Sequence, residues 1–215
     1  MAIHTPLPIE DADRIVRAHG LGAARAVHGI LAGSVNSNFF VAADARRVFV
    51  RIYEEQGVEG VDYEWALLDH LLGAGLPVPR RVPGPTPGEL RVRGKPTAVF
   101  ETMGGEEVCQ AMVDPPRARA VGALVARAHA AAQGFPRRRG GRFQRQDVRQ
   151  RLEQVAALDR PELRYAVGVL RDELDGLDAR RDSLPLGVIH GDLFRDNVRW
   201  EGERVVGILD WDIAS

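Results

Sequence analysis

The hydrophobic period changes twice along this chain, and these changes limit the architectures it can adopt. A helical pattern covers residues 8–19, with two acidic residues in its first turn and Gly20 as the expected stop. The pattern then switches to short runs rich in valine, phenylalanine, isoleucine and tyrosine, which predict strands at residues 26–31, 38–43 and 48–53. A hairpin turn is expected at residues 44–47, between the second and third strands.

A helix and two more strands complete this first part. The helix is expected at residues 61–72, with glycines at its end. Residues 77–88 contain five prolines and two glycines and must form a loop. Strands follow at residues 89–93 and 97–102, and Met103-Gly104-Gly105 is the natural hinge.

The second part is mainly helical. Helices are expected at residues 116–132, 147–158 and 161–177, because their apolar residues fall on one stripe. Strands return at residues 187–189, 198–200 and 204–210. The chain is therefore expected to divide at the hinge into residues 1–103 and residues 104–215.

Composition excludes several classes of protein. The 29 basic and 30 acidic residues give a formal charge of −1, so no global field attracts nucleic acid or anionic membranes. Cys109 is the single cysteine, which excludes a disulfide framework or a cysteine-rich zinc site within one chain. No apolar run approaches the roughly 20 residues of a membrane helix, and no secretory signal is visible. A cytoplasmic enzyme or binding domain is the expectation that remains.

The chemistry is concentrated near the C-terminal end. A buried strand is expected to deliver His190 and Asp192 into a loop, and Asn197 begins the next strand. Asp210 follows thirteen residues later at the end of an apolar strand, where a carboxylate is unfavourable unless a cation meets it. This arrangement suits phosphoryl transfer, in which one carboxylate accepts a hydroxyl proton while an amide oxygen and a second carboxylate hold Mg²⁺ on nucleotide phosphates.

His-Gly-Asp-x-x-x-x-Asn followed by Ile-Leu-Asp-Trp resembles the catalytic loop and metal-binding aspartate of the aminoglycoside phosphotransferase and choline kinase superfamily, relatives of the protein kinases. The resemblance implies an α+β, protein-kinase-like fold of two lobes: a five-stranded antiparallel nucleotide-binding lobe with one main helix, and a mostly helical catalytic lobe. It also implies that Asp192 is the catalytic base, that Asn197 and Asp210 bind the metal, and that His190 is structural. Asp196 is interpreted as a turn residue, and Asp212 as either a bystander or a contact to metal or substrate.

The same resemblance places the ATP site in the N-terminal part. Ser34, Asn36 and Ser37 occupy the position of a phosphate-covering loop, although a polar hairpin turn has the same composition. Arg51 stands where kinases place a phosphate-anchoring lysine, and Glu64 is its candidate partner; the alternative is two solvated charges.

The backbone of Glu101 and Met103 is placed at the adenine by position alone. Lys95, in a Gly-Lys-Pro turn, is expected at the surface. The implied cofactors are ATP and Mg²⁺.

Further segments resemble the homoserine kinase branch of the superfamily, namely residues 36–41, 52–54, 75–79 and 186–197. The expected function is transfer of the ATP γ-phosphoryl group to a small-molecule hydroxyl, with homoserine as the leading acceptor. An aminoglycoside, choline-like or sugar-alcohol kinase is the alternative, as is a non-catalytic nucleotide-binding module. The expected partner is a small-molecule alcohol, with no nucleic acid and no membrane.

Members of this superfamily continue for several helices beyond the metal-binding aspartate. The chain is therefore expected to be incomplete, with apolar surface on Leu209, Trp211 and Ile213 left uncovered. The alternative is a compact variant in which the helices at residues 116–132 and 161–177 form the whole floor of the site.

Overall fold

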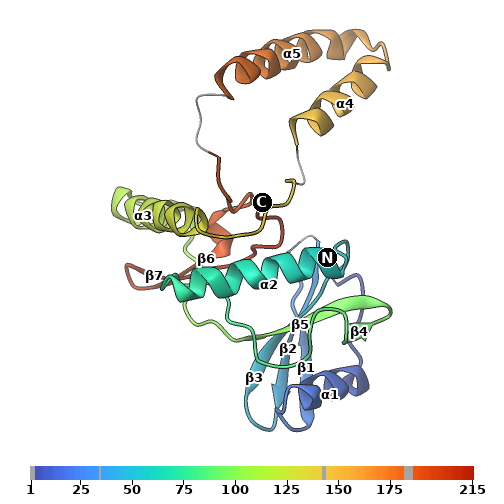
Figure 1. The fold of residues 1–215 in the computed structure, drawn as a ribbon, viewed down its shortest axis with the longest axis vertical. Coiled ribbons are helices and arrows are strands. Elements are labelled where there is room, and N and C mark those ends of the chain that lie inside the picture. The colour runs from blue at the N-terminus through green and yellow to red at the C-terminus, as the bar shows by residue number, and fades with distance from the viewer. Residues whose placement is uncertain (1–2, 34, 142–143, 182–185) are drawn as a thin grey trace. The chain divides into compact units, whose positions relative to one another are not determined.

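The computed structural model describes residues 3–33, 35–141, 144–181 and 186–215. Five strands form one antiparallel sheet in the order β1-β2-β3-β5-β4 (Figure 1). They are β1 (Ala24–Gly29), β2 (Ser37–Ala43), β3 (Arg47–Ile52), β4 (Arg91–Val92) and β5 (Lys95–Glu101). The five-stranded antiparallel sheet predicted from the sequence is confirmed, although β4 is shorter than expected.

Side chains alternate between the two faces of this sheet, because successive residues of a strand point to opposite sides. Helix α1 (Ile9–Ala18) packs against one face through Ile15 and Val16, and the valines of β3 complete that core. The other face carries polar and aromatic side chains from the intervening positions: Asn38, Phe40, Phe49, Arg51 and Phe100. One face is therefore a core, and the other lines a cavity.

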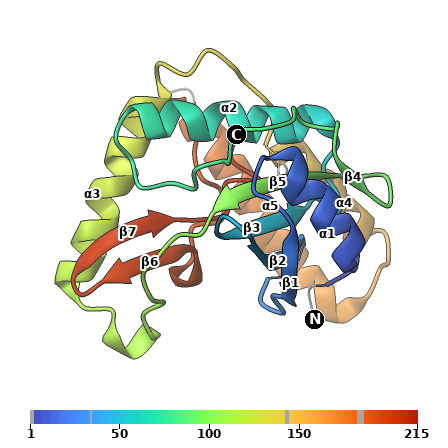
Figure 2. The same cartoon turned by 90° about the horizontal axis from the view of Figure 1, so that it is seen from below.

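Helix α2 (Val58–Gly73) brings buried residues from Val61 to Leu71 inward, including Glu64. It contacts α3 (Pro115–Ala132), which starts where the Asp114 carboxylate accepts a hydrogen bond from the Arg117 amide at 2.9 Å. The hairpin of β6 (Val198–Glu201) and β7 (Arg204–Ile208) lies beside α3 (Figure 2). Two short 3₁₀ turns, η1 (Gln110–Met112) and η2 (Arg195–Asn197), precede α3 and β6.

These elements form one compact unit, Met1–Arg137 with Asp192–Asp212. Arg138–Gly191 and Ile213–Ser215 form the second unit. The second unit consists mainly of α4 (Arg145–Ala156) and α5 (Pro161–Arg181), which pack against each other. No helix in the described part of the chain has the length and apolarity needed to cross a membrane.

The expected strand at residues 187–189 is not formed as such, since residues 186–190 have no regular secondary structure. Ile189 instead exchanges two backbone hydrogen bonds with Ser215, at 3.0 and 3.2 Å. The strand expected to run to Asp210 ends at Ile208, because Asp210 adopts a left-handed backbone with φ 63°.

Candidate active site

A cavity of about 440 Å³ opens on the polar face of the sheet. Its apolar lining comes from strands β2, β3 and β5, from loops and from the hinge: Ile30, Phe40, Phe49, Pro79, Phe100, Met103 and Leu209. Its charged and amide lining comes from elements far apart in sequence: Asn38, Arg51, Glu64, Glu101, Glu107, Asp196, Asn197, Arg199 and Asp210. A concave site that combines apolar surface with converging polar groups is typical of small-molecule binding.

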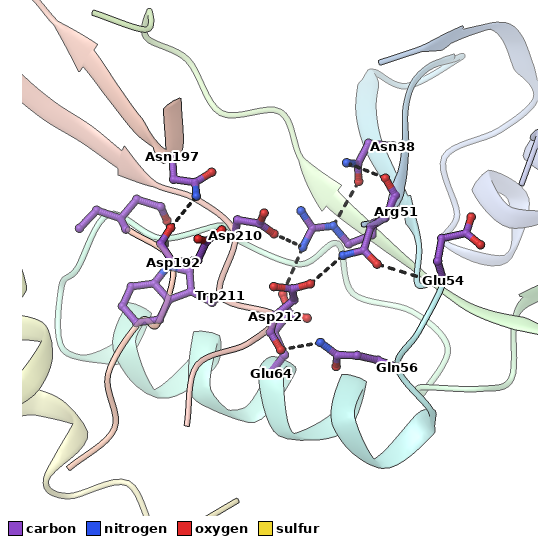
Figure 3. Close-up of polar contacts among 12 residues, drawn as sticks. Asn38, Arg51, Glu54, Gln56, Glu64, Asp192, Asn197, Asp210, Trp211 and Asp212 are labelled. Atoms are coloured by element: carbon purple, nitrogen blue, oxygen red, sulfur yellow. Dashed lines mark hydrogen bonds and ion pairs between the residues drawn. The ribbon is translucent and has the colours of Figure 1, made fainter. Parts of the chain in front are cut away.

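Arg51 is the centre of the polar part of this cavity (Figure 3). Its Nε donates a hydrogen bond to Asn38 Oδ1 at 3.2 Å, which fixes the guanidinium in place. Its Nη1 lies 3.6 Å from Glu64 Oε1 and 2.9 Å from Asp210 Oδ1, the latter an ion pair outside hydrogen-bond geometry. The structure brings Arg51 and Glu64 together, as their order in the sequence suggested. It adds Asp210 as a partner that the sequence did not link to Arg51.

Burial and charge set the protonation of this cluster. Burial disfavours the charged form of Arg51, but Asp210 and Glu64 more than compensate and raise its pKa above the ordinary value. Burial also raises the pKa of Glu64 to about 7, against the lowering effect of Arg51 and with a further rise from Asp212. Two carboxylates, Glu64 and Asp210, therefore share the one positive charge of Arg51. Glu64, the buried carboxylate, is partly protonated near pH 7.

The loop that carries Asp192 is held by Asn197. The Asn197 side-chain Nδ2 donates to the Asp192 carbonyl oxygen at 2.8 Å (Figure 3). The Asn197 carbonyl accepts the Leu209 amide at 2.8 Å, which places Asn197 next to the segment that contains Asp210. Asn197 and Asp210 line the same cavity, as does Asp196, which the sequence analysis interpreted only as a turn residue.

Asp210 has an unfavourable backbone conformation for a non-glycine residue, and such residues cost about 1–3 kcal/mol each and concentrate at functional sites. The neighbouring residues hold it in place. The Trp211 indole donates to the Ile208 carbonyl at 2.9 Å and is only 4% exposed. The expectation that Trp211 carries uncovered apolar surface is therefore wrong, because its ring is buried.

The residues expected to form a phosphate-covering loop are placed differently. Ser34 lies outside the described residues. Ser37 is fully buried: its Oγ accepts the amides of His4 and Thr5 at 2.9 and 3.0 Å and donates to Glu54 at 2.5 Å. Asn36 is 5% exposed, and its side chain contacts Asp212 and the Glu54 amide. Neither residue is part of the cavity lining, and both side chains make contacts within the fold.

Lys95 is also placed differently from the sequence expectation. Its Nζ pairs with the buried carboxylate of Glu54 and contacts the Thr5 hydroxyl at 3.0 Å. Its side chain is 36% exposed, so its ammonium is a partner of a buried acid and not a free surface charge. The long-range Glu54 contact was invisible in the sequence.

Glu101 and Met103, at the end of β5 and in the hinge, both line the cavity. The Glu101 amide donates a hydrogen bond to the Arg80 carbonyl at 2.9 Å, and the Glu101 carboxylate pairs with Arg46 at 3.1 Å. The Met103 amide has no backbone partner among the described residues. Gly207 allows Met103 to approach, because a Cβ there would lie 2.1 Å from the methionine sulfur.

The donor set at the cavity suits Mg²⁺. Asp210 contributes a carboxylate whose Oδ1 is buried without a hydrogen-bond partner among the described residues, and Asn197 has an amide oxygen. Mg²⁺ prefers such hard oxygen ligands and usually takes only one or two from the protein, with phosphates and waters completing its shell. The described residues contain no group of three or more histidine, cysteine or acidic side chains suited to a metal.

Known proteins similar to this chain are phosphotransferases. Residues 26–215 match the model of a family described as the phosphotransferase enzyme family. The homoserine kinase of Methylobacillus flagellatus is 32% identical over 218 residues, which is 100% of this chain and 66% of the relative. The chain thus spans about two thirds of the length of that relative.

Solved structures share the fold. The macrolide 2′-phosphotransferase MphH from Brachybacterium faecium superposes with a TM-score of 0.64 at 21% identity, covering 95% of this chain and 72% of that one. The spectinomycin phosphotransferase APH(9)-Ia, in complex with ADP and spectinomycin, gives a TM-score of 0.66 at 12% identity, covering 98% and 70%. The protein-kinase-like fold expected from the sequence is confirmed.

Proposed function

The chain belongs to the phosphotransferase enzyme family, and on that premise we propose that it transfers the γ-phosphoryl group of ATP to the hydroxyl of a small molecule, with homoserine as the leading acceptor. The observation that carries the proposal is the convergence of Arg51, Asn197 and Asp210 on one cavity. Relatives named homoserine kinase support the choice of acceptor. A reaction that consumes ATP would take place in the cytoplasm.

The nucleotide would lie along the cavity with its base at the apolar end. Phe40, Phe100 and Met103 offer apolar surface there, and the Met103 amide offers a hydrogen-bond donor. The phosphates would lie toward Arg51, whose planar guanidinium binds phosphate oxygens well. Asn38 holds the guanidinium from its Nε side and Glu64 from its Nη1 side, so the Arg51 side chain is fixed where it lines the cavity.

Asn197 and Asp210 would hold Mg²⁺ through their side-chain oxygens, and the metal, when bound, would neutralise charge on the phosphates. Glu64 would keep Arg51 in place while Asp210 exchanges its ion pair with Arg51 for the metal. Asp192 would orient the acceptor hydroxyl and take its proton late, because phosphoryl-transfer transition states are loose and depend mainly on positioning.

The test is phosphorylation of a panel of acceptors by Mg·ATP: homoserine, an aminoglycoside, choline and a sugar alcohol. Asp192→Asn should lower turnover by about 10²- to 10⁴-fold, the usual span for a general base, and change nucleotide affinity little. Asp172→Asn, the same change at an exposed position of α5, serves as the control and should leave turnover unchanged.

Four outcomes test the proposal. Turnover of homoserine above the other acceptors supports the proposal. Preference for another alcohol retains the reaction and replaces the acceptor. Binding of Mg·ATP without turnover of any acceptor favours a non-catalytic module, and an Asp192→Asn variant of unchanged rate removes Asp192 from the mechanism.

A further inference from the structure

Asn36 joins two segments that are 176 residues apart. Its Nδ2 donates to Asp212 Oδ2 at 2.8 Å, and its Oδ1 accepts the Glu54 amide at 3.3 Å. It is buried, at 5% exposure, so the amide group is used inside the protein. Asn36 immediately precedes β2 and therefore ties the segment after β7 to the sheet.

Asp212 is itself buried, at 6% exposure, and is absent from the cavity lining. A buried carboxylate is costly unless hydrogen bonds satisfy it, and the Asn36 amide is one such donor. Gln56 lies in the loop just before α2, and its side chain donates a hydrogen bond to the Asp212 carbonyl (Figure 3). Asp212 is thus anchored through both its side chain and its backbone.

Asp210 lies between this anchor and a second one. On the other side, the Leu209 amide is bound to the Asn197 carbonyl at 2.8 Å. Between these fixed points Asp210 has its positive φ of 63°, a conformation that persists only when the surroundings over-determine it. Loss of either anchor would let the backbone relax and turn the Asp210 carboxylate away from Arg51 and the cavity.

We infer that Asn36 is a positioning residue for Asp210, acting through Asp212, and that it is not a contact to the nucleotide. The inference rests on the proposed function, since it concerns the residue proposed to hold the metal. On this inference, the Asn-Ser-Asn segment at the start of β2 holds in place the segment that contains Asp210. Asp212 is then an anchor and not a metal ligand.

The experiment measures ATP affinity by calorimetric titration with Mg²⁺ and with a chelator, and takes the ratio of the two dissociation constants. Asn36→Asp places two carboxylates at hydrogen-bond distance and keeps the acceptor for the Glu54 amide. Asp212→Asn alone keeps a hydrogen bond to Asn36. The double variant, Asn36→Asp with Asp212→Asn, restores the bond with donor and acceptor exchanged. Gln154→Glu, on an exposed position of α4, controls for the added negative charge.

Asn36→Asp should reduce the Mg²⁺-dependent gain in affinity by about tenfold, the lower end of what a buried hydrogen bond to a charged group contributes. The double variant should recover the gain to within about threefold, and Gln154→Glu should retain it. A purely structural role would lower the melting temperature of Asn36→Asp and leave the Mg²⁺-dependent ratio unchanged, which would overturn the inference.

Three further outcomes decide the remaining cases. If Asn36→Asp does not fold, the double variant alone decides. A Mg²⁺-dependent gain in ATP affinity equal to that of wild type supports the inference, and loss of this gain in the double variant overturns it. A gain lost in both Asp212→Asn and the double variant would make the Asp212 carboxylate a direct metal contact, against the inference. A wild-type protein without any Mg²⁺-dependent gain would instead refute the proposed function itself.

Discussion

Glu64→Gln should flatten the pH dependence of stability. The Glu64 side chain is 2% exposed, and burial raises its pKa from 4.5 to about 7 despite the nearby guanidinium of Arg51. The folded state therefore binds a proton on Glu64 more tightly than the unfolded state does. Below pH 4.5 Glu64 is protonated in both states and does not change the free energy of unfolding. As the pH rises above 4.5, its ionisation lowers the free energy of unfolding, and this loss is complete above about pH 7.

The magnitude follows from the two pKa values. One pKa unit corresponds to about 1.4 kcal/mol, so the full cost is on the order of 3 kcal/mol, of which about 2 to 3 kcal/mol develops between pH 5 and pH 8. Glutamine has nearly the same shape and cannot ionise. The variant keeps the ion pair between Arg51 and Asp210, so the cavity loses only the titrating group.

The measurement is urea denaturation of wild type and variant at half-unit steps from pH 5 to pH 8. The free energy of unfolding of wild type should fall relative to that of Glu64→Gln by about 2 to 3 kcal/mol over this range. Glu59→Gln is the matched control, the same change on the exposed first turn of the same helix, and its curve should run parallel to wild type. A difference between wild type and Glu64→Gln that does not vary with pH would refute the reasoning.

Three more predictions address the cavity and its supports. Arg51→Met should weaken ATP binding by about ten- to a hundredfold, because a hydrogen bond to a charged group contributes about 1.5–3 kcal/mol, while Arg51→Lys should keep part of the affinity; equal affinities by calorimetry would contradict this. Ser37→Ala removes the acceptor for two backbone amides and should lower the free energy of unfolding by about 1–3 kcal/mol in urea, so an unchanged midpoint would speak against it. Gly191→Ala places a side chain on a backbone with φ 85° and should lower local stability by about 1–2 kcal/mol. The measurement is amide hydrogen exchange, which should become faster at residues 189–192; protection equal to that of wild type would contradict this prediction.

Local patterns predicted the sheet and the helices, because each depends on neighbours in the chain. The alternation along β2 and β3 already separates a core face from a polar face, and it fixes Arg51 on the polar one. The expected strand at residues 187–189 failed for the opposite reason. Its backbone partner is Ser215, which no local pattern could indicate.

The same distinction applies to the candidate site. The spacing of Asp192, Asn197 and Asp210 could be read from the sequence, because all three lie between residues 192 and 210. The contacts of Asn36 and Lys95 could not be read, because their partners, Asp212 and Glu54, are set by tertiary packing. The position of Asn36 before β2 predicts a phosphate-covering loop, but position in the sequence does not indicate where the side chain points.

The first compact unit is assembled from two stretches of chain separated by the 54 residues from Arg138 to Gly191, and this order has a consequence for synthesis. Strands β1, β2 and β3 pair with sequence neighbours and can form while the chain is still emerging, because such hairpins close in microseconds. Closing a loop of 54 residues adds a chain-entropy cost of about 3.5 kcal/mol, so the β6–β7 hairpin joins late. At about 5–20 residues per second, the ribosome needs roughly 3 to 11 s to make that intervening stretch. During this interval Arg51 and Glu64 have been made and Asp210 has not, so the nascent chain has two of the three charged groups of the cluster.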